Sequence, residues 1–410
     1  MRGSEEYVCG LDVGTGKTCM IIACARSDGR LEMMASGFSD SRGLVKGIVI
    51  NQQEAVASIL RAAGEVESKS KRSANSVVAG ISGSHIQSYN FRGSVLVRGK
   101  NLEVTTQDME SAIHAARSIP LPPEREIIHV LPREFFLNKQ GGITNPVGLS
   151  GSQLDADLHV VSCDSSMCQR LVSAANKAQI EVRKVILQSI ASGEAVLTPE
   201  EKEVGAVVVD IGSGTTDIAV YLKNSICFTS VIPVGGENFT LDLVEGLHTS
   251  RNGAEHIKIE FGNVLPDLIS PDEVVTVQGL GTRGQHDFPR KRICEFLHDR
   301  GAELLEIVRG DILHSGVRDK LVAGAVFTGG GSLMQGILDL AETVLDMPVR
   351  LGLPMGFEGL EKELAHPGYA CAIGLTMLEA QKKTQKDFSD MPAPTPALSL
   401  VDRILSWFEE

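Results

Sequence analysis

Two short loops in this chain carry residues whose types and spacing could bind a phosphate. Residues 12–18 read Asp-Val-Gly-Thr-Gly-Lys-Thr, and residues 210–216 read Asp-Ile-Gly-Ser-Gly-Thr-Thr. Glycines tolerate positive φ, which lets successive backbone N–H groups turn inward and cradle phosphate oxygens. The carboxylate that heads each loop would repel a phosphate, so its natural role is to hold a hydrated Mg²⁺ that bridges the phosphates. One such loop alone is more often a simple glycine hairpin, whereas two copies favour a phosphate site.

Apolar, β-branched runs flank both loops and predict a strand before and after each glycine turn. The end of the first loop, Gly16-Lys17-Thr18, also matches the end of a P-loop signature. The first glycine of that signature is missing, because Leu11 occupies its position, and the run after Thr18 is apolar rather than amphipathic. We therefore interpret the first loop as a turn between two strands and reject the P-loop.

A third glycine-rich segment, residues 328–332, follows the apolar strand 325–327. The spacing predicts a helix over 333–345 that begins at this loop. A glycine-rich turn between a strand and a helix lets a flat ring or a ribose lie close to the backbone. The third loop therefore suits the adenosine of a nucleotide.

Composition places the chain among globular proteins and excludes several function classes. The 410 residues are 42% hydrophobic and 22% charged, and their formal charge of −13 argues against nucleic acid as a partner. The eight cysteines form no Cys-x-x-Cys pair, so we expect buried free thiols rather than disulfides or a zinc site. The sequence contains neither a signal-peptide core nor an apolar run of about eighteen residues, and it predicts neither export nor a membrane span.

The elements between the loops predict an inserted subdomain. A helix over 53–67 and a strand over 76–81 precede residues 85–163, where the pattern of the sequence changes. That region holds a glycine-punctuated hairpin and a helix over 106–118 with Thr105 or Thr106 as its N-cap, which indicates a small α+β insertion. Helices over 166–179 and 189–197 then lead to the second loop, and residues 237–320 are mostly helical.

Three glycine loops in this order resemble the first phosphate, second phosphate and adenosine motifs shared by actin, the sugar kinases and the heat-shock ATPases. Residues 191–195 and 367–375 resemble the two connecting helices of that superfamily. Within it, residues 145–151, 232–236 and 254–258 resemble FtsA, the actin-like family of bacterial cell division. The likeness extends from about residue 7 to residue 410.

This resemblance implies an α/β fold, the two-lobed actin-like (ribonuclease H-like) ATPase fold with a small α+β inserted subdomain and a C-terminal amphipathic helix. The expected parts are the first lobe core (1–84, 164–196 and 360–380), the inserted subdomain (85–163), the second lobe core (197–236 and 321–359), its outer subdomain (237–320), a flexible linker (381–397) and the terminal helix (398–410).

The resemblance also implies ATP and Mg²⁺ in the cleft between the lobes, with Asp12 and Asp210 as the metal residues. The expected nucleotide-binding residues are Gly14, Thr15, Gly16, Lys17, Gly212, Ser213, Gly214, Thr215, Thr216, Gly235, Glu255, Lys258, Gly329, Gly330 and Gly331. By matching position, Glu255 and Lys258 would contact the ribose or adenine side, and a solvated helix face explains them equally well.

Related hydrolases place a water-orienting polar residue before the first connecting helix. Here Arg183 and Lys184 stand in that stretch, and Gln188 comes several residues late. No carboxylate is evident there that could relieve a water of its proton. We therefore expect at most slow ATP hydrolysis and assign no catalytic residue.

The C-terminal tail decides between functions. Residues 381–397 lose apolar periodicity and read as a linker, able to span on the order of 50 Å when extended at about 3.1 Å per residue. Residues 398–410 place all their apolar side chains on one half of a helical wheel. The expected membrane-binding residues are Leu398, Val401, Ile404, Leu405, Trp407 and Phe408. Such a helix could dock on its own body, but a proline-containing linker favours reversible binding to a membrane surface.

The first functional hypothesis is a membrane-tethering scaffold at the division site, on the cytoplasmic face of the inner membrane. The FtsA resemblance implies that the chain polymerises, binds the C-terminal peptide of the tubulin-like FtsZ through 237–320, and meets later division proteins through 85–163. The basic residues that would suit an acidic peptide are Arg290, Lys291, Arg292 and Arg300, and for each of them a solvated helix face is an equal alternative.

Two alternatives remain open on the sequence alone. A pilus-assembly actin-like protein would lack the tethered helix. A small-molecule kinase of the same fold would need a base and a substrate pocket in the cleft.

Overall fold

The computed structural model describes residues 6–26, 30–98, 100–118, 121–281, 283–358, 360, 362–381 and 387–389. Contacts divide the chain into two compact units. Unit 1 comprises residues up to 89, 123–128 and 161–385, and unit 2 comprises 90–122, 129–160 and the residues from 386 onward. Apart from Gln381 and residues 387–389, the predicted linker and terminal helix lie outside the described residues. No helix in the described part of the chain is both long enough and apolar enough to cross a bilayer.

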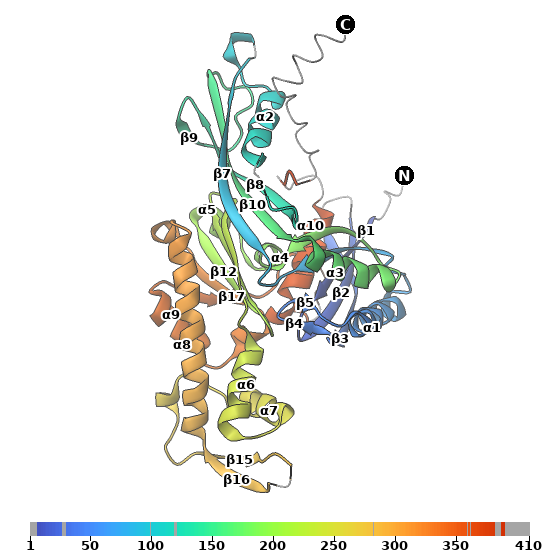
Figure 1. Ribbon diagram of the computed structural model, residues 1–410, viewed down its shortest axis with the longest axis vertical. Helices are drawn as coiled ribbons and strands as arrows, with labels where there is room; N and C mark the ends of the chain where they lie inside the picture. Colours follow the sequence, from blue (N-terminus) through green and yellow to red (C-terminus); the bar gives the residue numbers. More distant parts are fainter. Residues whose placement is uncertain are drawn as a thin grey trace. The chain divides into compact units, whose positions relative to one another are not determined.

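The first sheet of unit 1 has six strands in the order β11-β6-β1-β2-β3-β19 (Figure 1). Their bounds are β1 Glu6–Val13, β2 Lys17–Ala25, β3 Leu31–Asp40, β6 Ser76–Ile81, β11 Glu181–Leu187 and β19 Phe357–Glu358. β1, β2 and β3 form an antiparallel meander, and β6 and β11 extend it in parallel. α1 (Gln52–Ser70) packs against β3, and α3 (Ser165–Lys177) packs against β11. A short ribbon of β4 (Leu44–Val45) and β5 (Ile48–Val49) precedes α1.

The second sheet of unit 1 repeats this topology in the order β14-β13-β12-β17-β18. Its strands are β12 Ala206–Ile211, β13 Thr216–Leu222, β14 Ser225–Ile232, β17 Gly324–Thr328 and β18 Val349–Leu351. An antiparallel meander is again followed by two parallel strands. Every residue of β12 and of β17 is buried, which the continuous β-branched runs of the sequence favour. The chain therefore builds the same sheet twice.

Two helices of small residues lie in the interior of unit 1. α4 (Gln188–Val196) and α10 (Ala370–Ala380) pack on each other; α10 also covers β1, and α4 packs against β12 and β13. Their close approach depends on glycine, because a Cβ on Gly374 would meet the backbone of Ala191. These are the two connecting helices that the sequence predicts.

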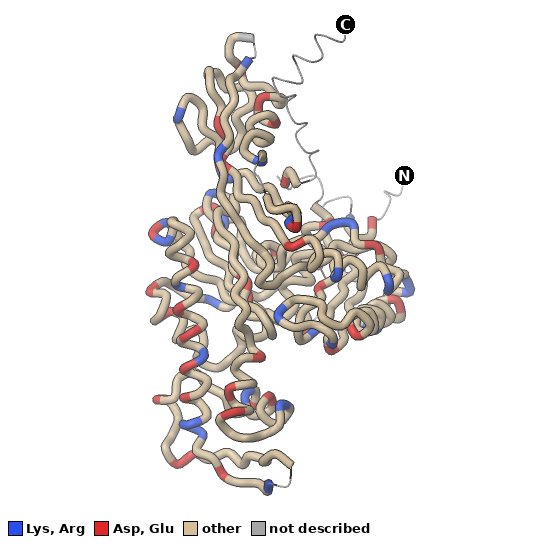
Figure 2. The backbone as a smooth tube through the Cα atoms, in the orientation of Figure 1, with Lys and Arg blue, Asp and Glu red and all other residues tan. Residues whose placement is uncertain are grey.

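The remaining part of unit 1 is mostly helical, as predicted for 237–320. It contains α5 (Pro199–Val204), α6 (Gly236–Leu247), α7 (Arg251–Phe261), α8 (Arg290–His314), α9 (Ile337–Leu345) and a hairpin of β15 (Val274–Gln278) and β16 (Gln285–Pro289). One apolar core joins α6, α8 and α9 to the second sheet. Both basic and acidic residues occur along α8 (Figure 2). The helix predicted over 333–345 is shorter than expected, because Gly330–Leu333 forms a 3₁₀ turn and α9 begins at Ile337.

Among its described residues, unit 2 contains a four-stranded sheet in the order β7-β10-β8-β9 and an α-helix. The strands are β7 Gln87–Leu96, β8 Arg125–Leu137, β9 Gln140–Ile143 and β10 Gln153–Asp164, of which β7, β8 and β10 also have residues in unit 1. The helix, α2 (Thr106–Arg117), begins at a capping box in which Thr105 and Asp108 bond each other's backbone N–H groups. The predicted α+β character is confirmed, and of the two predicted N-caps, Thr105 and Thr106, the structure has Thr105.

Candidate functional site

The two predicted phosphate loops are tight turns of the same geometry. β1 and β2 pair up to Val13 and Thr18, and β12 and β13 pair up to Ile211 and Thr216. The N–H of the first loop glycine closes each turn, from Gly14 to the carbonyl of Lys17 at 3.0 Å, and from Gly212 to that of Thr215 at 2.8 Å. The prediction of strand, glycine turn and strand is confirmed for both loops, and with it the rejection of a P-loop.

The two loops face each other across one cleft within unit 1. A Cβ on Gly16 would lie 2.9 Å from Cβ of Ser213, and a Cβ on Gly214 would lie 2.5 Å from Oγ1 of Thr15. Glycine at these two positions therefore lets the backbones approach. The cleft has a volume of about 280 Å³. The predicted residues that line it are Asp12, Gly14, Thr15, Gly16, Lys17, Asp210, Gly212, Ser213, Gly214, Thr215, Gly329 and Gly330.

The carboxylates that head the two loops, Asp12 and Asp210, are both buried. Burial raises the pKa of Asp12 to about 6, against the lowering influence of Lys17. The pKa of Asp210 is also raised to about 6: burial raises it most, a hydrogen bond from Ser192 lowers it, and the charge of Asp12 raises it. Two buried acids, one of which raises the pKa of the other, favour a site for a cation. Their oxygen atoms are the ligands that Mg²⁺ prefers.

Lys17 supplies one positive charge to the cleft. Its ammonium donates to the carbonyl of Gly368 at 2.7 Å and lies 3.3 Å from the centre of the Tyr369 ring. Burial lowers the pKa of Lys17, while Asp12 and Asp210 favour its charged form. The lysine therefore compensates part of the negative charge of the two carboxylates and stands where an anionic ligand would be attracted.

Gln188 corrects one expectation from the sequence. It is the first residue of α4 and lines the cleft, and its Nε2 donates to Oδ1 of Asp12 at 2.8 Å. The expectation that this glutamine comes too late in the chain to serve the site is wrong, because β11 ends at Leu187 and delivers the next residue to the cleft. An amide at this position can orient a water by hydrogen bonding.

A further buried acid beside the site, Asp217, was not predicted from the sequence, because it lies just beyond the second loop. It stands opposite Asp210 on β13, and its carboxylate accepts hydrogen bonds from Ser82 at 2.6 Å and from Thr215 at 2.9 Å. Burial raises the pKa of Asp217 to about 7. The two loops differ here, since the residue opposite Asp12 is Cys19. This difference between the two otherwise matched loops is the feature of the sequence that could have indicated Asp217.

Gly235 and Gly236, which follow β14, pack against the backbone of the second loop. N–H groups at the start of α6, those of Gly236 and Glu237, donate to the carbonyls of Gly212 at 2.9 Å and Ser213 at 2.8 Å. A Cβ on Gly235 would lie 2.7 Å from that same Ser213 carbonyl. Gly235 is therefore placed by the structure as a packing residue behind the loop rather than in the cleft lining.

Glu255 and Lys258 lie on α7, and Lys258 bonds the start of α6 next to the second loop. The Lys258 ammonium donates to Gly236 O at 3.0 Å, to Thr240 Oγ1 at 2.8 Å and to Glu255 at 2.7 Å. The Lys258 side chain is 12% exposed, so the solvated-face alternative fails for it, whereas Glu255 is 45% exposed. Neither residue is among those that line the cleft.

The third glycine loop packs directly on the second. Gly329 has φ +82°, and a Cβ there would collide with Asp210. Gly331 packs against Ile211 in the same way, which explains why it stands outside the cleft lining. Thr216 also points elsewhere, since its hydroxyl donates to Val234 O at 2.8 Å. Gly329 and Gly330 remain in the lining, together with His366, Pro367 and Gly368.

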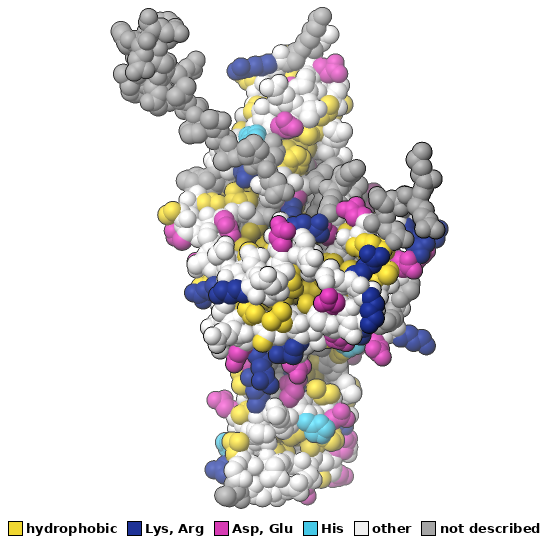
Figure 3. All heavy atoms as spheres, turned by 90° about the vertical axis from the view of Figure 1, so that its right-hand side faces the viewer, with side chains coloured by type: hydrophobic (Ala, Val, Ile, Leu, Met, Phe, Trp, Pro, Cys, Tyr) yellow, Lys and Arg dark blue, Asp and Glu magenta, His cyan; other side chains and the backbone are white. Residues whose placement is uncertain are grey.

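The predicted basic residues of α8 are already paired. Arg290 bonds Glu273, Lys291 bonds Asp267, Arg292 bonds Glu295, and Arg300 bonds Asp242 and Glu303. The hollow of about 520 Å³ that Arg300 lines also holds the acids Asp242, Glu245, Asp299 and Glu303. On the face drawn in Figure 3, the described Lys and Arg side chains are likewise interspersed with Asp and Glu. An acidic peptide at Arg300 would therefore have to compete with existing ion pairs.

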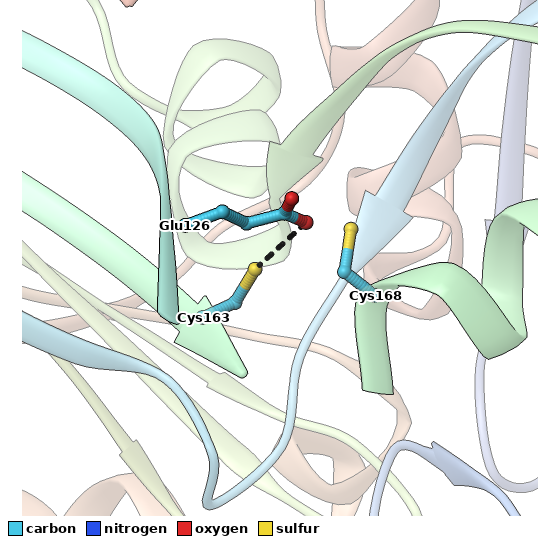
Figure 4. Close-up of side chains that lie close together, drawn as sticks. All are labelled: Glu126, Cys163 and Cys168. Carbon is cyan, nitrogen blue, oxygen red and sulfur yellow. Dashed lines mark hydrogen bonds between the residues drawn. The ribbon is translucent and has the colours of Figure 1, made fainter. Parts of the chain in front are cut away.

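Glu126, Cys163 and Cys168 form a second group of potential ligands, away from the cleft lining (Figure 4). The Cys163 thiol donates to the Glu126 carboxylate at 3.6 Å. Hydrogen bonding to Cys168, burial and the charge of Glu126 all raise the pKa of Cys163. The group is therefore described as two neighbouring buried thiols, one of which is hydrogen-bonded to Glu126. All eight cysteines are free and buried, as predicted.

Comparisons with known proteins agree with this architecture. A family model described as cell division protein FtsA matches residues 207–374, and one described as the SHS2 domain inserted in FtsA matches residues 83–162. Cell division protein FtsA of Pseudomonas aeruginosa is 35% identical over 99% of this chain and 98% of its own length. Cell division protein FtsA of Borreliella burgdorferi is 36% identical over 99% of this chain and 98% of its own length.

Solved structures support the same fold at lower identity. The PilM–PilN type IV pilus biogenesis complex aligns with a TM-score of 0.65 at 16% identity, covering 93% of this chain and 100% of that one. MreB5 of Spiroplasma citri bound to ADP aligns with a TM-score of 0.54 at 13% identity, covering 91% of this chain and 96% of that one. Together with the doubled sheet, these likenesses confirm the predicted actin-like fold and its insertion.

Proposed function

The chain belongs to the FtsA family of bacterial cell-division proteins, and we propose that it holds ATP and Mg²⁺ between its two loops while it ties the FtsZ ring to the membrane. A role in cell division follows from the family. The nucleotide, the membrane and the individual partners are the proposal, and each has its own support in the residues described above.

The observation that carries the proposal is the pair of matched turns that face each other with a buried carboxylate at the head of each. The residues present fit a metal-bound nucleotide: Asp12 and Asp210 would hold Mg²⁺ through their oxygens, and the loop N–H groups and hydroxyls would hold the phosphates. Gly329 and Gly330 would approach the adenosine. Bound Mg²⁺ would offset the mutual repulsion of the two carboxylates and of the phosphates.

We propose that hydrolysis at this site is slow. Gln188 can orient a water, but the carboxylates that line the described cleft are the two metal residues themselves. Asp217 has a suitable pKa of about 7, yet it is engaged by Ser82 and Thr215 and is not part of the lining. Because the described lining offers no further carboxylate to accept the proton of a water, we propose that ATP serves as a clamp that holds one state of the chain for assembly into filaments.

Membrane attachment is proposed for residues 398–410 from their sequence. The six apolar residues assigned to insertion contribute roughly 1.5–3 kcal/mol each when fully buried, offset by the ordering of a short helix. Three acids against Arg403 leave this segment with a net charge of −2 (one minus three), so insertion depends mainly on apolar area. FtsZ would bind through 237–320, and later division proteins through 85–163.

Trp407 is the only tryptophan and reports on this proposal directly. When liposomes are added to the purified full chain, we expect a blue shift of its emission and co-sedimentation with lipid. Ile404→Asp places a charge on the apolar face and should abolish both signals. Ser406→Asp places the same charge on the polar face and should leave both intact. An unshifted emission with unchanged sedimentation would eliminate the tether.

A further inference from the structure

Three residues near the start of the linker, Asp387, Phe388 and Ser389, belong by their contacts to unit 2. The sequence predicts that the whole of 381–397 is a free tether between the body and the terminal helix. The contacts of these three residues contradict this for their part of the linker, because they bond both the edge of β8 and the end of α2.

Asp387 is the anchor of the segment. Its Oδ2 accepts from Nδ1 of His129 at 2.8 Å, and its Oδ1 accepts from the N–H groups of Val130 and Ser389, both at 3.0 Å. The side chains of His129 and Asp387 are only 1% and 2% exposed. A carboxylate leaves water at a large cost unless its oxygens are bonded again, and here both oxygens have partners. An aspartate at this position is therefore recognised specifically.

The backbone of the segment is also held. The N–H of Phe388 donates to the carbonyl of Val130 at 2.9 Å, so Val130 uses both of its main-chain groups on the segment. This stretch of β8 is available because β9 pairs with β8 only at Phe135 and Leu137. The contact resembles the addition of a short peptide to an open strand edge, where main-chain bonds give affinity and a side-chain pocket gives specificity.

Arg117 closes the site from the other side. It is the last residue of α2, and its guanidinium donates to the carbonyl of Phe388 at 3.5 Å and to that of Ser389 at 3.1 Å. One charged side chain thus satisfies two carbonyls that the loss of water would otherwise leave unbonded. Strand β8, helix α2 and the segment's own Asx turn together account for the position of all three residues.

We propose that unit 2 carries a peptide-binding site for an Asp-aromatic-Ser segment, and that its occupant is residues 387–389 of this same chain. If membrane attachment is also correct, which is a separate proposal, only residues 390–397 of the sequence separate this segment from the terminal helix. Eight residues extend to about 25 Å at about 3.1 Å each, half the reach of the whole linker. The site then sets how far the body stands from its terminal helix.

Hydrogen exchange on the full-length chain without lipid tests the site independently of the membrane proposal. We expect slow exchange at both Phe388 and Val130, because each donates its N–H across the contact. Asp387→Ala should accelerate exchange at both amides, each by about tenfold or more. Asp390→Ala, a neighbouring aspartate that no aromatic residue follows, should change neither. Free exchange at residues 387–389 of the wild type, or acceleration there without any change at Val130, would overturn the site.

A labelled peptide of residues 384–391 tests whether the vacated site can be refilled. We expect it to bind the full-length Asp387→Ala chain and to bind wild type much more weakly, because wild type already fills its own site. Adding Arg117→Ala to the Asp387→Ala chain should abolish the binding. Equal binding to wild type and Asp387→Ala would contradict the assignment. If the protection of the Phe388 N–H increased with protein concentration, the segment in the site would come from a second copy of the chain. That result would overturn the proposed occupant.

Discussion

Replacing Asp210 by asparagine should stabilise the nucleotide-free chain and weaken its binding of ATP and Mg²⁺. The pKa of Asp210 is raised from 3.8 to about 6 in the folded chain, because burial disfavours its charge. The folded state therefore binds more protons than the unfolded state between about pH 4 and pH 6, and the free energy of unfolding falls as the pH rises through that window. Above it, the ionised group costs about 3 kcal/mol of stability. Asparagine removes this cost and still accepts the bond from Ser192.

The assay is urea unfolding of the nucleotide-free chain at pH 4 and at pH 8, followed by titration with ATP and Mg²⁺. We expect Asp210→Asn to raise the unfolding free energy by up to about 3 kcal/mol at pH 8 and by little at pH 4. Affinity for ATP with Mg²⁺ should fall by about 1.5–3 kcal/mol, or roughly tenfold to hundredfold, since a charged ligand group is lost. Asp319→Asn, at a side chain that is 97% exposed, is the matched control and should change neither quantity. The reasoning is refuted if Asp210→Asn destabilises the chain at pH 8 or leaves the affinity unchanged.

Three further predictions follow from the same contacts. Gly214→Ala places a Cβ 2.5 Å from Thr15 Oγ1 and should cost about 1–3 kcal/mol of nucleotide affinity by calorimetry. Gly310→Ala, where a Cβ meets nothing within 4 Å, should leave nucleotide affinity unchanged and raise the melting temperature slightly. If both substitutions changed the affinity equally, the close approach of the two loops would not be what binds the nucleotide. All eight thiols should resist a thiol reagent at pH 8 until denaturant is added, because all are buried, and rapid reaction of any native thiol would contradict this. Vesicle binding should vary little with the fraction of anionic lipid or with salt, and a steep salt dependence would reassign it to the lysines of the linker.

Local patterns in the sequence were sufficient to predict the two loops and the sheets that carry them. β-branched runs on both sides of each glycine turn leave few alternatives to a hairpin, and the repetition of the pattern excluded coincidence. Ion pairs within helices also follow from local spacing in the sequence. Arg292 and Glu295, Arg300 and Glu303, and Glu255 and Lys258 are each three residues apart on a helix, the spacing at which side chains meet.

Contacts between distant segments were not predictable in the same way. Gln188 meets Asp12 across 176 residues of chain, and its place in the cleft depends on where β11 ends. Asp387 meets His129 across 258 residues, and nothing in the proline-containing linker signals that one aspartate is bound. Thr216, the first residue of β13, bonds the carbonyl of Val234, which is 18 residues away, and of this pair only Thr215 lines the cleft.

The claim that this chain ties FtsZ to a membrane is tested most directly by vesicle flotation of purified FtsZ. With the full chain, ATP and Mg²⁺ present, FtsZ should float with the vesicles, and with Ile404→Asp it should remain in solution. Ser406→Asp should support flotation as well as wild type does. FtsZ that floats equally with Ile404→Asp, or that stays in solution while the wild-type chain floats, would contradict the account.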